Sequence, residues 1–340
     1  MLSRFLLLGL ILLLKSCTEE SNPKDITVAI YHWKSTYEPS ASSEKTLEAL
    51  KIKKYYLHFF DIDYDFESKE PIPKSVIRFK AKPEGKIIPV IFITNRTFKS
   101  IRGNQIDSLA AKTALKVRDI AEKQDLTFNE VQLDCDWSKS TKSDYFRFLN
   151  VLKAEFASSV ELSVTLRLHQ IKFKEQTGVP PVKKGALMLY NVGNFMNINT
   201  PNSLFDPNII DQYIYRLPEY PLTLAIALPL YHQTVVYRNR KFETFFKNFS
   251  NQQLKEKFNL EASELGNLLT LDRDITFRKH SFRKGDIFRY ESVNFKHLNQ
   301  VKEAILKRLP RKKAEIILFH LDENSLDNFT PEQYTQLLSS

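Results

Sequence analysis

The segment EVQLDCDWSKS, residues 130–140, decides how the rest of this chain is interpreted. Its first residues are typical of a β-strand leaving a core, and the strand ends in Asp134, Cys135 and Asp136. Trp137, one of two tryptophans in 340 residues, follows at once. Because side chains alternate along a strand, both aspartates point into the same space, while Cys135 points away as a small buried hydrophobe.

Two carboxylates held this close repel each other, so we expect one of the two pKa values to rise. A carboxyl pair with separated pKa values suits acid–base chemistry. The alternative is a structural pair that hydrogen-bonds to neighbouring strand ends.

The composition is that of an ordinary globular protein, with 42% hydrophobic and 26% charged residues. The 8 glycines include no GxGxxG or GxxxxGK[ST] motif, which argues against a phosphate-binding loop. The basic residues are spread along the chain without a nucleic-acid motif, so we expect no nucleic-acid partner.

The first residues predict export rather than a folded element. Arg4 precedes a short apolar run, and Leu14-Lys15-Ser16-Cys17 resembles a bacterial lipobox. We therefore predict a lipoprotein signal segment over 1–17, in which Cys17 is kept after cleavage and is lipidated with acyl chains such as palmitate. A plain export signal or an uncleaved anchor is the alternative. Loss of the two charges of Arg4 and Lys15 lowers the net charge from +10 to +8.

Residues 18–25 are predicted to be a tether that holds the protein at the outer membrane, facing the periplasm or the cell surface. Thr18-Glu19-Glu20 resembles the acidic signal of some surface-exposed lipoproteins. With Cys17 lipidated, Cys135 is left without a disulfide partner.

Apolar runs alternate with helical patterns from residue 26 to the end of the chain. Runs that are apolar on both faces favour parallel strands covered by helices. Helical periodicity is clear over 105–124, 142–156 and 294–309. The eight apolar runs are 26–33, 54–63, 86–94, 130–137, 161–169, 186–192, 222–231 and 315–323.

Eight strands alternating with helices predict an α/β fold, a (β/α)8 barrel over 26–340. A doubly wound open sheet is the alternative. The long gap before the last strand predicts an inserted, partly β lobe at about 233–293, between strand seven and the last helices. We expect a monomer.

Polar and aromatic side chains gather at the carboxyl ends of these strands, where barrel enzymes place their active sites. Both tryptophans and five of the 7 histidines lie there. Aromatic faces pack on sugar rings, and polar side chains bond to hydroxyls, so the pattern predicts a glycan pocket. Each histidine taken alone is better explained as a satisfied rim residue, and it is the grouping that favours a pocket. The predicted substrate-binding residues are Trp33, His32, His58, Asp61, Trp137, Arg167, His169, Asn191, Tyr231, Gln233, His320 and Glu323.

Three segments resemble glycoside hydrolase family 18, the chitinases and endo-β-N-acetylglucosaminidases. Residues 133–137 resemble the family's strand-four motif, D-x-x-D-x-D-x-E. Residues 188–191 resemble its strand-six motif, M-x-Y-D, and residues 227–231 resemble its strand-seven segment. The strand-four pattern is also similar to that of a group of bacterial barrel lipoproteins. The resemblance implies a barrel acting on N-acetylglucosamine-containing glycans, with the sugar's own acetamide as nucleophile.

The resemblance also implies roles for three catalytic candidates. Asp136 would orient the acetamide, Asp134 would support Asp136, and Tyr190 would hydrogen-bond the acetamide oxygen. The motif is degenerate, because Val131 replaces its first Asp and Ser138 replaces the Glu that serves as general acid.

Asn191 likewise replaces the Asp of the strand-six motif. Either the acid comes from elsewhere, with Asp61, Asp63 or Glu323 as candidates, or the site binds glycans without cleaving them, like the lectin-like relatives of the family.

A metal-dependent hydrolase is a third class. Metal barrels often carry an H-x-H pair on one strand, and the chain has neither this pair nor an HExxH motif. We expect neither a metal ion nor a cofactor.

Overall fold

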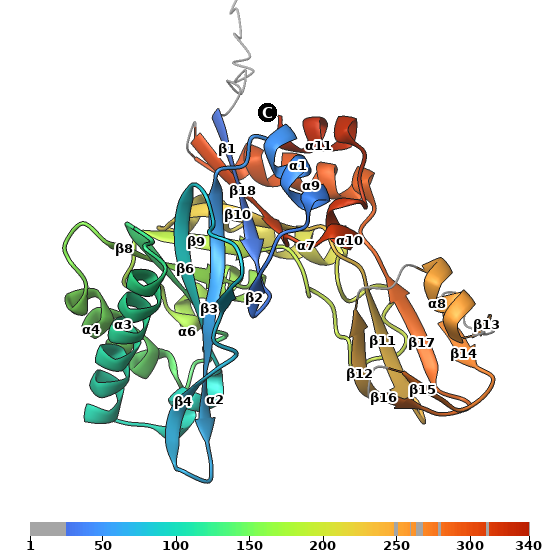
Figure 1. The fold of residues 1–340 in the computed structure, drawn as a ribbon, viewed down its shortest axis with the longest axis horizontal. Helices are drawn as coiled ribbons and strands as arrows, with labels where there is room; N and C mark the ends of the chain where they lie inside the picture. Colours follow the sequence, from blue (N-terminus) through green and yellow to red (C-terminus); the bar gives the residue numbers. More distant parts are fainter. Residues whose placement is uncertain are drawn as a thin grey trace, which may run out of the picture.

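The computed structural model describes residues 25–247, 251–258, 260–262, 268–277, 280–310 and 313–339 (Figure 1). The signal segment 1–17, with Cys17, and tether residues 18–24 lie outside these ranges.

Eight parallel strands close into a barrel, which confirms the predicted (β/α)8 fold. β1 pairs with β18 on one side and with β3 on the other, so the sheet has no free parallel edge. The order around the wall follows the chain. The strands are β1 (Asp25–His32), β3 (Lys54–Asp65), β6 (Lys86–Ile93), β7 (Glu130–Asp134), β8 (Glu161–Leu166), β9 (Lys184–Met188), β10 (Thr223–Pro229) and β18 (Lys313–Phe319).

Helices surround this wall and bury their apolar faces against it. The three periodic segments form α3 (Asn104–Lys123), α4 (Lys142–Glu155) and α9 (Phe295–Arg308). The other helices around the barrel are α1 (Ala41–Ala49), α2 (Asn95–Ser100), α5 (Leu168–Lys172), α6 (Lys174–Thr177), α7 (Pro207–Ile214), η1 (Leu217–Glu219), α10 (Glu323–Leu326) and α11 (Pro331–Leu338).

Short extra strands decorate the barrel. β4 (Glu70–Lys74) forms an antiparallel hairpin with the long β3, and β2 (Thr36–Tyr37) pairs with β5 (Arg78–Phe79).

A mainly antiparallel lobe follows β10 and projects to one side of the barrel (Figure 1). Its five-stranded sheet has the order β12-β11-β17-β14-β13, and a separate hairpin joins β15 to β16. The elements are β11 (Gln233–Arg238), β12 (Lys241–Lys247), α8 (Asn251–Phe258), β13 (Leu260–Ala262), β14 (Leu268–Leu271), β15 (Ile275–Phe277), β16 (His280–Phe282) and β17 (Ile287–Glu291).

A buried ion pair attaches this lobe to the barrel. Arg289 Nε donates to Glu291 Oε1 at 2.8 Å, and both side chains are fully buried. The same carboxylate accepts from the backbone N–H groups of Ser203 and Leu204, in the loop that follows β9. Arg289 also donates to the backbone oxygen of Asn197 at 2.8 Å. A chain segment after strand six is thereby tied to the lobe.

Candidate functional site

The two aspartates of the opening segment lie at the carboxyl end of β7. Asp134 is the last residue of the strand and is buried, whereas the Asp136 side chain is 46% exposed. The hydroxyl of Thr165, on the neighbouring β8, donates to Asp134 Oδ1 at 2.5 Å. The pair therefore has one carboxyl inside the wall and one facing solvent.

Arg167 clamps the outer carboxylate. Its Nε donates to Asp136 Oδ1 at 2.8 Å and its Nη2 to Asp136 Oδ2 at 3.1 Å, a bidentate ion pair. Arg167 follows β8 directly, so parallel neighbouring strands deliver both partners to one point. The guanidinium therefore occupies two acceptor positions that Asp136 would otherwise offer a ligand.

The pKa of Asp134 is raised to about 6, first by burial and then by the negative charge of Asp136, while Arg167 and the hydrogen bond from Thr165 oppose the rise. Asp134 thus titrates near neutrality, as the close spacing of two carboxylates predicts. It is the inner, least accessible member of the pair.

Aromatic rings form the centre of the barrel mouth around Phe319, the last residue of β18. The Phe319 ring centroid lies 4.6 Å from that of Tyr190, 5.5 Å from Tyr231 and 5.8 Å from Trp33. Trp33 is half-buried, while Tyr190 and Tyr231 are buried. The Phe319–His320 peptide is cis. The rings are tilted against one another, and those of Trp33 and Phe319 are partly exposed.

His58 and Asp61 form a second polar pair at the mouth, with His58 Nε2 2.7 Å from Asp61 Oδ1. A bulge in β3 between His58 and Phe60 shifts the alternation. Both side chains therefore face the interior although three positions separate them. The Trp33 ring lies over His58, with 5.0 Å between centroids.

Two of the three displaced-acid candidates, Asp63 and Asp61, have pKa values below their usual values. Arg96 hydrogen bonds hold the pKa of Asp63 far below its usual value, against the effect of burial. Burial raises the pKa of Asp61, but its hydrogen bonds with His58 and Ser75 outweigh that effect and lower it. Glu323 is an exposed residue at the start of α10.

Ser138, at the position of the general acid, is turned into a local hydroxyl cluster. Its backbone N–H donates to Thr141 Oγ1 at 2.9 Å, and its own Oγ lies 3.0 Å from Ser140 Oγ. These bonds tie Ser138 to the turn that starts α4.

Three of the predicted substrate-binding residues face away from the interior of the mouth or belong to another contact. Trp137 is 1% exposed, because the alternation that turns the aspartates inward turns Trp137 toward α4, where its indole donates to Thr177 O at 2.9 Å. His32 is on the outer side of β1 against Tyr37, with burial lowering its pKa to about 3.

The third is Gln233, whose amide donates to the buried Glu291 at 2.9 Å and belongs to the joint between lobe and barrel. Both His32 and Gln233 are 3% exposed.

Five predicted substrate-binding residues lie around the mouth, namely Arg167, His169, Asn191, Tyr231 and His320. His169 is exposed and lines a shallow hollow with Arg167, Tyr190 and Asn191. Asn191 is exposed, has a positive φ of 54°, and accepts from the Tyr231 hydroxyl at 3.1 Å. The His320 ring lies 6.3 Å from that of Tyr231.

Sequence reasoning missed Phe319 and Thr165. Both follow from alternation, because Phe319 shares the face of Ile317 on β18, and Thr165 lies on the strand beside Asp134. The predicted runs 161–169 and 315–323 extend three and four residues beyond the observed strand ends at Leu166 and Phe319, so these two positions were not treated as strand ends.

Within the described residues, no group of three or more His, Cys, Asp and Glu side chains is arranged to hold a metal ion. In the same part of the chain, no helix has the length and apolar character needed to cross a membrane.

Comparison with family models and with curated proteins gave no match. Solved structures do match. The spore cortex-lytic enzyme SleL of Bacillus cereus has a TM-score of 0.54 at 14% identity, covering 92% of this chain and 74% of that chain.

Two chitinases of glycoside hydrolase family 18 match along nearly their whole length. ChiB from the chitin utilization locus of Flavobacterium johnsoniae has a TM-score of 0.52 at 12% identity, covering 92% of this chain and 95% of that chain. The Cycas revoluta enzyme, solved with (GlcNAc)3, has a TM-score of 0.53 at 11% identity, covering 91% and 99%.

At these identities the likeness establishes the fold. The chain has the barrel fold of the family 18 chitinases and SleL, as the three sequence motifs predicted.

Proposed function

We propose that the barrel mouth binds a glycan containing N-acetylglucosamine and does not cleave it by the substrate-assisted route. The observation that carries this proposal is the bidentate Arg167–Asp136 ion pair, beside a serine at the general-acid position.

The mouth has the surfaces that a sugar requires. Trp33 and Phe319 are half-exposed rings suited to the apolar face of a pyranose, and such contacts make up much of the affinity of sugar sites. Arg167, Asp136 and Asn191 surround the rings with groups that bond to hydroxyl and amide atoms.

Cleavage requires groups that this site does not bring together. The substrate-assisted route needs one carboxylate to orient the acetamide and a protonated acid at the leaving oxygen. Asp136 is held by Arg167 and Ser138 has no acidic proton near neutrality, while the pKa of Asp61 and that of Asp63 lie below their usual values.

The test uses the soluble chain from residue 20 with N-acetylglucosamine oligosaccharides and a wider polysaccharide panel. Binding is followed by calorimetry and product release by chromatography. We expect binding without release, weakened at least tenfold in Arg167→Ala and in Trp33→Ala.

Arg147→Ala is the matched control, because Arg147 forms an equivalent bidentate pair with Asp107 between α4 and α3, away from the mouth. Its binding should equal wild type. Release of shortened products by the wild type, lost in Asp136→Asn, would establish a hydrolase instead and overturn the proposal.

We further propose that Cys17 is lipidated and holds a monomer at the outer membrane. β1 begins at Asp25 on the face opposite the mouth, so a tether entering there leaves the mouth turned away from the membrane. Cys17→Ala should move the protein from the membrane fraction to the soluble fraction, and sedimentation of the soluble form should give one chain.

A further inference from the structure

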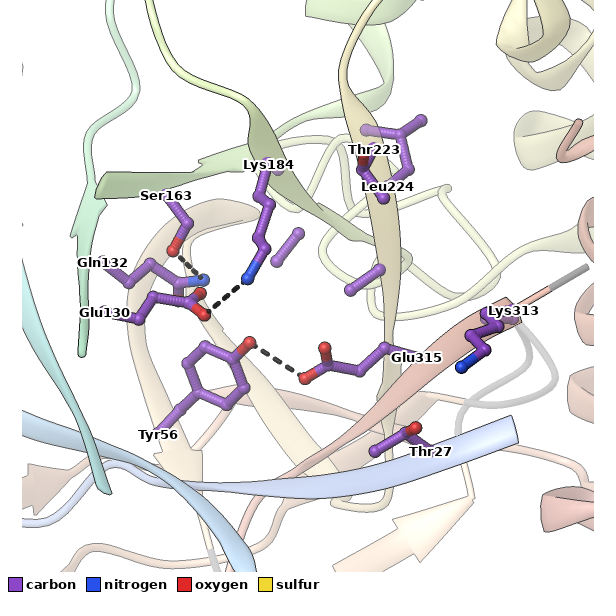
Figure 2. A pocket seen from close by; sticks show the side chains of 14 residues that line it. Thr27, Tyr56, Glu130, Gln132, Ser163, Lys184, Thr223, Leu224, Lys313 and Glu315 are labelled. Atoms are coloured by element: carbon purple, nitrogen blue, oxygen red, sulfur yellow. Dashed lines mark hydrogen bonds and ion pairs between the residues drawn. The ribbon is translucent and has the colours of Figure 1, made fainter. Parts of the chain in front are cut away.

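A second polar cavity lies at the opposite, amino-terminal end of the barrel interior (Figure 2). Its volume is about 160 Å³, roughly an order of magnitude above the ~15 Å³ that one water needs. Seven strands contribute residues that line it, among them Thr27, Tyr56, Glu130, Gln132, Ser163, Lys184, Ala186, Thr223, Ala225 and Glu315.

The space exists because small side chains occupy inward positions of neighbouring strands. Ala186 on β9 and Ala225 on β10 are register partners, and Ala225 lies beside Glu315 on β18. Layers of branched residues such as Val, Ile and Leu normally fill this part of a barrel. Alanine leaves it open.

The carboxylates of the cavity already have cationic partners. Lys184 Nζ lies 3.1 Å from Glu130 Oε2, and Lys54 Nζ donates to Glu315 Oε1 at 2.5 Å. The Tyr56 hydroxyl donates to the same Glu315 oxygen at 2.9 Å. A ligand with a net charge would upset this balance, whereas a neutral one would not.

Hydrogen-bonding capacity is left over. Glu130 is 1% exposed, and its Oε1 accepts no hydrogen bond. The bonds of Glu315 converge on Oε1, which leaves its second oxygen to the cavity. The hydroxyls of Thr27 and Thr223 line the same space. The lining is therefore suited to a ligand that both donates and accepts several hydrogen bonds.

We propose that this cavity binds one small neutral polyol, of the size of a sugar alcohol or a monosaccharide. Hydroxyl groups donate to the carboxylates and accept from the threonines, and the carbon skeleton packs on the two alanines. The cavity is separate from the mouth. The buried Tyr31 hydroxyl, which donates to Gln132 at 2.5 Å, lies between the cavity and the mouth.

The test measures binding of glycerol, erythritol, xylitol, myo-inositol and glucose to the chain from residue 20, by saturation-transfer NMR and calorimetry. We expect one polyol to bind. Ala225→Leu fills the cavity and Glu130→Gln removes a carboxylate oxygen with little change in size. Each should weaken that binding at least tenfold.

Glu161→Gln is the matched control, because Glu161 bonds to the same Lys184 at 3.2 Å without lining the cavity. It should bind like wild type, as should the mouth variant Arg167→Ala.

Three results would overturn the proposal: no binding of any of the five polyols, loss of binding in Arg167→Ala, or binding unaffected by both cavity variants. The first leaves a cavity that holds water, and the second assigns the polyol to the mouth. If Ala225→Leu does not fold, Glu130→Gln decides alone.

Discussion

Arg167 binds Asp136 through two hydrogen bonds of 2.8 and 3.1 Å, joining the ends of β7 and β8. The guanidinium also acts on the inner carboxyl, because its charge opposes the rise in the pKa of Asp134. One arginine therefore opposes the rise in the pKa of Asp134 and limits the contacts that Asp136 can offer a glycan.

Removal of this arginine should change stability in a pH-dependent way. In Arg167→Ala, two neighbouring carboxyls lose their shared counter-charge, so the pKa of Asp134 should rise further. We expect Tm to fall more at pH 7.5, which is above the pKa of about 6 of Asp134 in the wild type, than at pH 4.5. Differential scanning calorimetry at both values checks this, and an equal loss at both would contradict it. Arg147→Ala should show no such difference, since its pair is exposed.

Asp134→Asn should stabilise the protein at pH 7.5. In the folded protein the pKa of Asp134 is about 6, whereas that of an unfolded aspartate is near 4. The stability contributed by the protonated carboxyl is therefore complete below about pH 4, and it is lost as the pH rises through about 6. Asparagine keeps an acceptor for Thr165 without the buried charge. In urea denaturation, we expect the free energy of unfolding to increase by an amount on the order of 3 kcal/mol at pH 7.5. This increase should approach zero at pH 4.

Asp63→Asn provides the opposite case. Its folded pKa is depressed by Arg96, so its stabilisation is present above the unfolded pKa and is lost as pH falls. At pH 7.5 the free energy of unfolding of the variant should be lower than that of wild type by about 2 kcal/mol. This difference should become smaller as the pH is lowered. The same pH trend in both variants would refute the assigned roles.

The two tryptophans should separate binding from stability. Trp137→Phe removes a buried indole that stacks on Tyr145 with 5.2 Å between centroids, and it leaves Thr177 O without its donor. We expect a loss of about 2–4 kcal/mol of unfolding free energy and unchanged glycan affinity. Trp33→Phe should change affinity with little effect on stability.

Fluorescence of these two single-tryptophan proteins provides the readout. Glycan addition should shift the emission of Trp33 in Trp137→Phe and leave that of Trp137 in Trp33→Phe unchanged. A shift from Trp137 alone would place the glycan elsewhere.

The buried ion pair should hold the lobe to the barrel. Glu291→Ala leaves Arg289 charged and unpaired where no solvent reaches it, so we expect a loss of about 3–5 kcal/mol in urea denaturation. Glu243→Ala, in an exposed pair with Arg238 on the same lobe, should cost less than about 1 kcal/mol. Equal losses would mean that the Glu291 network does not support the lobe.

Several features followed from the sequence because they depend on local rules. Continuous apolar runs predicted the parallel strands, and helical periodicity predicted α3, α4 and α9 to within about two residues of their ends. Alternation along β7 predicted that Asp134 and Asp136 share a face and that Cys135 is buried.

The errors arose where the same rules were not carried to the strand ends. Alternation applied to Trp137 and His32 would have placed both on the outer side. The bulge that brings Asp61 beside His58 has no local signature, because it depends on the pairing of β3 with β6.

The sequence by itself determined the number and type of the strands, the degenerate family 18 motif and the serine at the acid position. These are properties of spacing and residue identity along one strand. Only the tertiary structure decided that Arg167 clamps Asp136, that Glu291 joins lobe to barrel, and that two alanines open a cavity beneath the mouth. Each joins residues from separate strands or loops, and barrel closure, rather than any local pattern, sets their distances.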